Sequence, residues 1–588
     1  MNYNLNDISA QQGKSSTGKA LRKLLQLIKE ERATLIFAQL AILTNSGLNL
    51  LSVYVIGITL DRYVLHGIKD YHGVLVNAGW LLLMYATVFG AGYAQSKLMG
   101  GVGQRMLFKL RNSIFNKLQE LPVAFFNQNK AGDLISRVNN DTDKINTFFS
   151  QSLMQFIGTL ATMTGAGIFL LVINFKLGLI TLVPGLCILI FTKVTSGWVK
   201  RKNAVNLKST GGLSSEIQES LNNFKVIIAF NRRDYFRKRF SDANEHQYKT
   251  AIGAGLANNV YLPVYGLFAS IAQLTVLVAG AYLISQHEFK LGLLISYLMY
   301  STNFYNPLRQ LAALWTSFQV AMAGWDRISH ILDLDSNLPV VEDNTISASP
   351  YLLEFKNVHF GYPGGKEILH NINLTLEQGK TYALVGPTGG GKTTTASLIA
   401  RLYDPVTGTV LLNGKDIRSY KPEERSVRIG FILQEPFLFT GTVRENILYG
   451  NEQYKSFTNE QLEDVITSGG LQSLLSVFEK GLDTPVASTG DTISLGQKQL
   501  IAFMRAVLRN PELLILDEAT ANIDTITEQI LEDILTKLPE TTTRVIIAHR
   551  LNTIQNADEI FFVNAGEVIR AGSLQHAVNM LLHGKRES

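Results

Sequence analysis

The stretch TYALVGPTGGGKTTTASLIARL, from Thr381 to Leu402, decides the fold of the second half of the chain. It begins as an apolar strand, continues as a glycine-rich turn and ends as a helical segment. The turn fits the pattern G-x-x-x-x-G-K-[ST] from Gly386 to Thr393. In this pattern the glycines let backbone N–H groups wrap phosphates, Lys392 neutralises phosphate charge and the threonine hydroxyl ligates Mg²⁺. Because a strand and a helix flank the pattern, we predict a nucleotide-binding loop.

Two further apolar strands end in residues that suit phosphate chemistry. The run ELLILDEAT ends in Asp517 and Glu518, and its unbroken apolar character predicts a central parallel strand with both carboxylates at the ligand-binding edge. We expect Asp517 to hold Mg²⁺ through water and Glu518 to polarise an attacking water, although an acidic strand end or helix cap is the alternative. The run RVIIAH ends in His549, which we place near the γ-phosphate; taken alone, it is more often a surface or packing residue.

The segment DTISLGQKQL, from Asp491 to Leu500, contains a capping-box pattern, because Ser494 is followed three residues later by Gln497. The pattern predicts that a helix begins at Ser494. A helix N-terminus attracts anions through unpaired N–H groups and its dipole. Most capping boxes only cap, so the segment alone does not establish a phosphate site.

The first half of the chain is a membrane domain by hydropathy. A chain of 588 residues is too long to fold around a single hydrophobic core, so two or more domains are expected. Six apolar stretches approach the roughly 20 residues that cross a bilayer. They are Leu35–Leu60, Val74–Leu98, Leu153–Ile173, Leu177–Thr192, which contains Pro184, Val260–Ile284 and Leu291–Leu311. Residues 1–18 are polar and show no cleavable signal pattern.

The distribution of Lys and Arg predicts the orientation of these spans. Two long basic loops, one before Leu153 and one before Val260, are expected to be cytoplasmic, and so are both termini and the second half of the chain. The net charge of +6 follows from this orientation, which disfavours nucleic acid as a partner. The one cysteine, Cys187, lies in a predicted span and excludes a disulfide within the chain.

Each basic loop keeps helical periodicity near the spans. Helices that continue for about 25 residues beyond the bilayer reach roughly 35 to 40 Å at 1.5 Å per residue. We therefore expect each loop to form a helical hairpin whose tip transmits force between a soluble motor and the membrane.

The order of the motifs resembles the ATP-binding cassette (ABC) family. Residues 352–582 resemble its nucleotide-binding domain, and the first half resembles the six-helix membrane domain of ABC exporters. The matching motifs are FGYP with Tyr362, which matches the family's aromatic residue that stacks on adenine, FILQEP with Gln434, the signature ISLGQKQ, and ANID with Asp524. The segments LPVAFFNQNKAGDLISRVNNDTDKI and ESLNNFKVIIAFNRRD resemble the regions of the two coupling helices.

The resemblance implies an α-helical six-span membrane domain with long cytoplasmic helical extensions, followed by an α/β P-loop ATPase domain with a helical subdomain. The expected domains are residues 1–333, including an N-terminal elbow helix, a linker at 334–350 and the ATPase domain at 351–588. The implied catalytic residues are Glu518, His549 and Gln434, and the implied Mg²⁺ ligands are Thr393, Gln434 and Asp517. The implied ATP-binding residues are Tyr362, Gly386, Pro387, Thr388, Gly389, Gly390, Gly391, Lys392, Thr393 and Thr394, with Ser494, Gly496, Gln497 and Asp524 contributed by a second subunit.

Two positions depart from the family pattern. Leu495 replaces the usual signature glycine, and Ser488 stands where a glutamate is common. An intact catalytic half with an altered signature resembles one subunit of a heterodimeric exporter, so a second half-transporter is the expected partner and a heterodimer is favoured over a homodimer. A leucine in a helical first turn is sterically allowed, which keeps the homodimer open.

The resemblance implies ATP-driven export of a hydrophobic or amphipathic drug, lipid or peptide across a bacterial plasma membrane. The polar residues in the spans either line a substrate cavity or bond helix to helix, and the second role is favoured for any one of them. They are Asn45, Asn49, Gln95, Gln273, Tyr297, Tyr300 and Asn303. The alternatives are an ATP-gated channel or sensor of the same architecture and a soluble ABC ATPase, which needs no spans.

Overall fold

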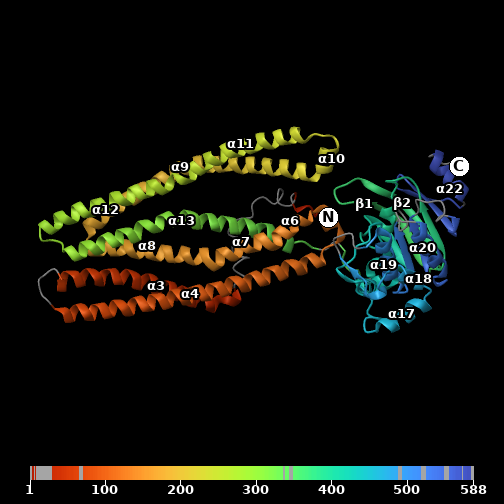
Figure 1. Cartoon of the computed structure of the whole chain (residues 1–588), viewed down its shortest axis with the longest axis horizontal. Coiled ribbons are helices and arrows are strands. Elements are labelled where there is room, and N and C mark those ends of the chain that lie inside the picture. Colours follow the sequence, from red (N-terminus) through yellow and green to blue (C-terminus); the bar gives the residue numbers. More distant parts are fainter. Residues whose placement is uncertain are drawn as a thin grey trace. The chain divides into compact units, whose positions relative to one another are not determined.

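The structure, a computed structural model (Figure 1), describes residues 3–5, 7, 29–64, 70–335, 338–342, 349–487, 493–517, 525–547, 555–572 and 574–583. The chain divides into two compact units. The helical unit contains residues 11–118 and 132–333, and the sheet unit contains residues 1–10, 119–131 and 334–588. The segment 119–131, which lies in the first predicted coupling region, therefore belongs with the sheets. The predicted elbow helix lies outside the described residues.

Helices of very different length build the helical unit. They are η1 Lys29–Glu31, α3 Arg32–Thr59, η2 Leu60–Val64, α4 Tyr71–Glu120, α6 Ala131–Ser136, η3 Arg137–Asp141, α7 Thr142–Thr147, η4 Phe148–Ser152, α8 Leu153–Ile173, α9 Phe175–Asn222, α10 Phe224–Ala229, α11 Arg233–Asn259, α12 Tyr261–Ser285 and α13 Leu291–Leu332. The 50 residues of α4 span roughly 75 Å, far more than the 30 Å of a hydrocarbon core. Long helical extensions beyond the bilayer are thus confirmed. In Figure 1, α9 and α11 run side by side and α10 joins them.

Five stretches of the described chain are long and apolar enough to cross a membrane. They are Arg32–Val64, Tyr71–Glu120, Ala131–Ile173, Phe175–Asn222 and Arg233–Ser285. Each contains one of the first five predicted spans. The sixth predicted span forms the start of α13, which is helical but carries more hydroxyl and amide side chains, so its crossing stays a prediction. Many apolar side chains on these helices are exposed, as a lipid-facing surface requires.

A close crossing joins α3 to the start of α13. A Cβ atom on Gly292 would lie 2.4 Å from the carbonyl oxygen of Gly57, so neither backbone leaves room for a side chain there. Next to this crossing, the carboxylate of Asp61 accepts hydrogen bonds from the N–H groups of Gly292 and Leu293, at 2.6 and 3.0 Å. Asp61 thereby satisfies two free donors at the N-terminus of α13 and complements the helix dipole.

Most of the polar residues identified in the spans bond one helix to another. Asn45 donates to Val88 O, Gln273 to Thr302 Oγ1, Tyr297 to Leu170 O and Tyr300 to Leu50 O, at distances of 2.7 to 3.1 Å. Asn49 donates to Asn45 within α3. The helix-to-helix bonding favoured for these residues is therefore confirmed for Asn45, Gln273, Tyr297 and Tyr300. Gln95 is different, because it lines a hollow.

Three sheets and short helices build the sheet unit. The strands are β1 Leu353–Gly361, β2 Glu367–Leu376, β3 Thr381–Val385, β4 Thr407–Leu412, β5 Lys415–Asp416, β6 Ile429–Ile432, β7 Gly441–Thr442, β8 Pro485–Val486, β9 Leu513–Asp517, β10 Thr543–Ile547, β11 Glu559–Asn564 and β12 Glu567–Arg570. The helices are α5 Val123–Gln128, α14 Lys392–Ile399, η5 Ile417–Ser419, α15 Pro422–Arg428, α16 Val443–Ile447, α17 Asn459–Ser468, α18 Gln472–Leu475, η6 Gly481–Asp483, α19 Leu495–Val507, α20 Thr525–Lys537 and α22 Leu574–His583. The sheet orders are β2-β1-β4-β5, β12-β11-β3-β10-β9-β6 and β7-β8.

We call the sheet β12-β11-β3-β10-β9-β6 the central sheet. Its strands are parallel apart from the edge strand β12, which is antiparallel to β11. Every residue of β3 and β9 is buried, as their unbroken apolar sequences predict. Helix α14 contacts β9 and β10. The fold class inferred from the sequence, a helical membrane domain followed by an α/β domain, is confirmed.

We predict that Gly292→Ala destabilises the helical unit. The added methyl group meets backbone rather than a flexible side chain, and such overpacking costs about 1–3 kcal/mol, more than the helix propensity that alanine gains. Thermal unfolding in detergent should show a lower midpoint for this variant. Gly79→Ala on α4 is the matched control, since nothing lies within 4 Å of its added Cβ. Equal melting of Gly292→Ala and wild type contradicts the close crossing.

Candidate functional site

The carboxyl edge of the central sheet gathers the residues selected from the sequence. Parallel strands bring their C-terminal ends to one edge, where α/β folds bind ligands. Strand β3 runs into the glycine-rich loop, β9 ends at Asp517, and Gln434 follows β6. The register supports this alignment, because Ile547 at the end of β10 pairs with Leu384 on one side and Asp517 on the other.

Glycine is required where the loop passes the neighbouring strand. Gly386 has a φ angle of 150°, and a Cβ atom there would lie 2.0 Å from the carbonyl oxygen of Val563 in β11. Gly391 has a φ angle of 115° and precedes the first residue of α14. A side chain at Gly386 is excluded by contact with β11, and a side chain at either position is excluded by the positive φ angle. The loop therefore curls tightly onto the N-terminus of α14, where anions are favoured.

Lys392 lies inside this curl. Its side chain is buried, and Nζ donates hydrogen bonds to the carbonyl oxygens of Gly386 and Pro387, at 2.9 and 3.0 Å. A buried ammonium needs such partners because desolvation of its charge is costly. The loop thus holds a positive charge where loops of this pattern bind phosphate oxygens.

Two oxygen donors meet beside the lysine. Thr393 Oγ1 lies 3.4 Å from Asp517 Oδ1, and Asp517 is buried. Mg²⁺ takes oxygen ligands and is commonly held by one or two protein groups together with phosphates and water. The hydroxyl and the carboxylate fit such a cation.

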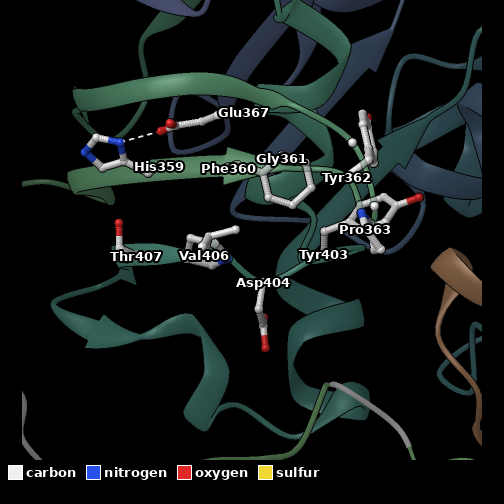
Figure 2. Close-up of a pocket in the computed structure, with 13 residues that line it drawn as sticks. His359, Phe360, Gly361, Tyr362, Pro363, Glu367, Tyr403, Asp404, Val406 and Thr407 are labelled. Carbon is white, nitrogen blue, oxygen red and sulfur yellow. Dashed lines mark hydrogen bonds and ion pairs between the residues drawn. The ribbon is translucent and has the colours of Figure 1, made fainter. Parts of the chain in front are cut away.

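An aromatic cluster lies next to the loop and borders a cavity of about 670 Å³ (Figure 2). The ring of Tyr362 packs edge-on against Phe360 and Tyr403, with centroids 5.1 Å apart in each pair. Its hydroxyl lies 3.2 Å from Thr394 Oγ1 on α14. Figure 2 shows Tyr362 and Tyr403 at one end of the cavity and His359 at the other. Tyr362 therefore connects the cavity to the phosphate-binding loop.

The capping box predicted at Ser494 is present. Ser494 Oγ accepts from Gln497 N at 3.2 Å, and Gln497 Oε1 accepts from Ser494 N at 2.9 Å. Gln497 Nε2 also donates to Val477 O. Leu495 is the first residue of α19 and is 41% exposed, whereas Gly496 is buried. A leucine is thus accommodated in the first helical turn without strain.

Comparison with known proteins identifies the family. Residues 35–308 match the ABC transporter transmembrane region, and residues 369–521 match the ABC transporter family. An ABC transporter ATP-binding protein of Bacillus subtilis is 32% identical over 563 residues, which cover 95% of this chain and 92% of that protein. The chain belongs to the ABC transporter family. It fuses an ABC membrane region to an ABC ATPase, so it is an exporter-type half-transporter and a multi-pass membrane protein.

Other relatives carry more specific names. A fatty acid ABC transporter ATP-binding/permease protein of Mycobacterium tuberculosis is 31% identical over 504 residues, covering 86% of this chain and 79% of that protein. A multidrug resistance ABC transporter ATP-binding and permease protein of Lactococcus lactis is 31% identical over 510 residues, covering 85% of each chain. The half-transporter architecture implies a dimer partner.

Within the sheet unit, α5 bonds directly to the aromatic cluster of the ATPase. Asn127 Nδ2 donates to the hydroxyl of Tyr403 at 2.8 Å, and the ring of Tyr403 packs against Tyr362. Burial raises the pKa of the Tyr403 hydroxyl, so this group stays neutral. Tyr403 was not identified from the sequence, because its partner lies 276 residues away. Its only local signal is its place just after α14.

Several site predictions fall on residues that the structure does not describe. Glu518, Asp524, His549 and Ser488 lie outside the described residues. Gln434 is exposed in the loop after β6. The roles of all the predicted site residues stay proposals.

We predict that Tyr403→Phe weakens the coupling of ATP hydrolysis to substrate. The variant keeps the ring against Tyr362 and loses the bond to Asn127, worth about 1 kcal/mol or roughly fivefold. The substrate-stimulated ATPase rate should fall while the basal ATPase rate stays near that of the wild type. Asn127→Ala should have the same effect on both rates.

Because both changes remove one bond, the double variant should lose no more than either single one. Tyr420→Phe is the matched control: its buried hydroxyl donates to Leu412 O at 2.9 Å and does not touch α5. If Tyr420→Phe and Tyr403→Phe have the same effect, the contact has no special part in coupling.

Proposed function

We propose that the protein exports a hydrophobic or amphipathic drug, lipid or peptide by alternating access, with ATP hydrolysed at the interface of two ATPase domains. The carboxyl edge of the central sheet is the observation that carries this proposal. There the buried Lys392 and the pair Thr393 and Asp517 lie together, in a chain that also carries membrane spans. The bias between membrane states comes from different affinities for ATP.

In this proposal each part of the edge has a distinct role. Tyr362 stacks on adenine, the loop from Gly386 to Thr394 binds the phosphates, and Lys392 stabilises charge on the transferred phosphoryl group. Mg²⁺ would be held by Thr393, Asp517 and Gln434, where it would supply positive charge to stabilise the phosphate oxygens. Glu518 orients the attacking water, and His549 contacts the γ-phosphate.

A second subunit completes the site. The N-terminus of α19 has its cap formed by Ser494 and Gln497, and the first N–H groups of a capped helix still favour anions. We propose that Ser494, Gly496, Gln497 and, from its own loop, Asp524 contact the ATP held by the partner's loop. The exposed Leu495 then lies at the subunit interface.

The tip of the second long hairpin supports a dimer as well. Helix α10 exposes Phe224 and Val226, and Phe230 after it is 74% exposed. Large apolar side chains gathered at a tip beyond the membrane mark an interaction surface. Because α5 already contacts the ATPase of its own chain, we propose that α10 docks on the ATPase domain of the second subunit.

We favour a heterodimer in a bacterial plasma membrane, with both termini and the ATPase domain in the cytoplasm. The unusual Leu495 and Ser488 suit a pair of unequal ATP sites. The spans carry few charged side chains, which favours an apolar or amphipathic cargo over an ion. Relatives named for fatty acid and multidrug transport agree with this class.

The partner is tested by purifying the tagged chain at native expression and identifying what accompanies it by mass spectrometry. A second, different half-transporter in equal amount supports the heterodimer. Only the tagged chain, at twice its monomer mass, supports the homodimer. A monomer that hydrolyses ATP at full rate contradicts the shared site.

We predict that Glu518→Gln lowers ATP turnover by roughly 100-fold or more, because the carboxamide cannot accept the water proton. ATP binding should persist, since Glu518 holds no phosphate in this scheme. Phosphate release and nucleotide binding are measured on the same preparation, and chelation of Mg²⁺ should abolish turnover in the wild type. Wild-type turnover by the variant, purified with any partner subunit, would show that Glu518 does not activate the attacking water.

A further inference from the structure

A hollow of about 640 Å³ lies in the helical unit between α4 and the segment that runs from α7 through η4 to α8. We name it the carboxamide pocket after the residues that dominate its walls. It is lined by Gln95, Ser96, Met99, Gly100, Gln104, Asn146, Thr147, Ser150, Gln151, Met154 and Gln155. Four glutamines and one asparagine thus face one space, which lies beside the middle of α4 and the start of α8.

The floor of the pocket is apolar and its walls are polar. Met99 and Met154 are buried in a hydrophobic cluster with Ala38, Ile42 and Val102. Among the described residues that line the pocket, none carries a charge. The nearby Arg105 bonds to the carboxylate of Glu31, at 2.7 Å from Nε, so its charge is already paired. An amphipathic molecule without a net charge matches these surfaces.

The glutamine side chains of the pocket do not bond one described helix to another. In the part of the chain that the structure describes, the side chains of Gln95, Gln104, Gln151 and Gln155 form no hydrogen bond with protein, unlike the other polar residues of the spans. Asn146 Oδ1 is buried and also lacks a hydrogen-bond partner. A buried acceptor left unpaired costs about 1–3 kcal/mol. Asn146 Oδ1 lies against Gly103 with almost no accessible surface, so the four glutamine side chains are the groups available to a ligand.

The backbone is shaped around the pocket. The residues Phe148–Ser152 form a π-helical turn, a feature that is frequent at functional sites. Below it the helices touch, because a Cβ atom on Gly103 would lie 2.5 Å from Asn146 Oδ1 and 2.7 Å from Ser150 Cβ. One turn away, nothing lies within 4 Å of a Cβ atom on Gly100. The space thus opens at Gly100 and closes at Gly103.

We infer that the carboxamide pocket binds the uncharged amide groups of an amphipathic substrate, while its apolar part contacts the floor around Met99 and Met154. Primary amides both donate and accept, so paired carboxamides complement a peptide-like amide. A carboxylate finds no cation among the lining residues, and a cation finds no carboxylate. The inference rests on the proposed export function and specifies its substrate class.

Three matched peptides test this chemistry on the purified full-length transporter, with any subunit that copurifies, in lipid vesicles. The first is a leucine hexapeptide acetylated at its N-terminus and amidated at its C-terminus. The second has a free carboxylate, and the third has a free amine. We measure binding of each without ATP, stimulation of ATPase, and ATP-dependent accumulation in vesicles whose ATPase domains face outward.

The variant Gly100→Leu places a large apolar side chain on a residue that lines the pocket, and its added Cβ has nothing within 4 Å. Gly90→Leu is the matched control on the same helix, since its added Cβ also has nothing within 4 Å and Gly90 does not line the pocket. We expect the capped peptide to bind the wild type best. Loss of two or more hydrogen bonds should raise its half-saturating concentration at least about tenfold in Gly100→Leu, with Gly90→Leu near wild type.

A second variant, Gln151→Leu combined with Gln155→Leu, keeps the size of the side chains and removes their hydrogen-bonding groups. It should weaken the capped peptide as Gly100→Leu does. Equal effects of Gly100→Leu and Gly90→Leu, equal binding of the three peptides, or loss of the dimer with Gly100→Leu would each overturn the inference.

The outcomes also separate this inference from the export proposal. If the capped peptide binds in a Gly100-dependent way and none of the peptides accumulates, the pocket stands and export fails. If another substrate is exported and the capped peptide neither binds nor moves, export stands and the pocket assignment fails.

Discussion

The structure depends on a positive charge held inside a loop of backbone. Lys392 is buried, and it is stabilised by the carbonyl groups of the same loop that is shaped to receive phosphates. This arrangement requires a fully buried β3 to launch the loop and glycines that let it pass within contact of β11. It also requires α14 to begin immediately after the loop. The tight packing of the central sheet is therefore part of the chemistry, because any looser edge would let water replace the loop carbonyls around the lysine.

An aromatic path runs within the sheet unit from the same edge to residues 119–131. Tyr362 contacts α14 through its hydroxyl and Tyr403 through its ring, and Tyr403 bonds to Asn127. Residues 119–131 belong structurally to the sheet unit even though they lie between two membrane helices in sequence. In the proposed function, these rings and the one hydrogen bond give a change at the nucleotide a route to residues 119–131.

In the helical unit, the membrane sets a different constraint. Polar side chains in lipid need partners, and Asn45, Tyr297 and Tyr300 find them on neighbouring helices. Asp61 does the same at the start of α13. Against this pattern, the four glutamines between α4 and α8 form no side-chain hydrogen bond within the described part of the chain, which leaves their amide groups open to the polar group of a ligand.

The sequence by itself determined the features that depend on the spacing of neighbouring residues. The loop at Gly386–Thr393, the buried strand before Asp517, the capping box at Ser494 and five of the spans each follow from spacing within fewer than thirty residues. Tertiary structure alone decided which distant groups meet. Tyr403 with Asn127, Asp61 with the start of α13, and Gln95 with Gln155 are chosen by how helices and sheets pack. The partner of a hydrogen-bonding side chain cannot be predicted from the local sequence, because it is fixed only when the surrounding backbone segments have packed together.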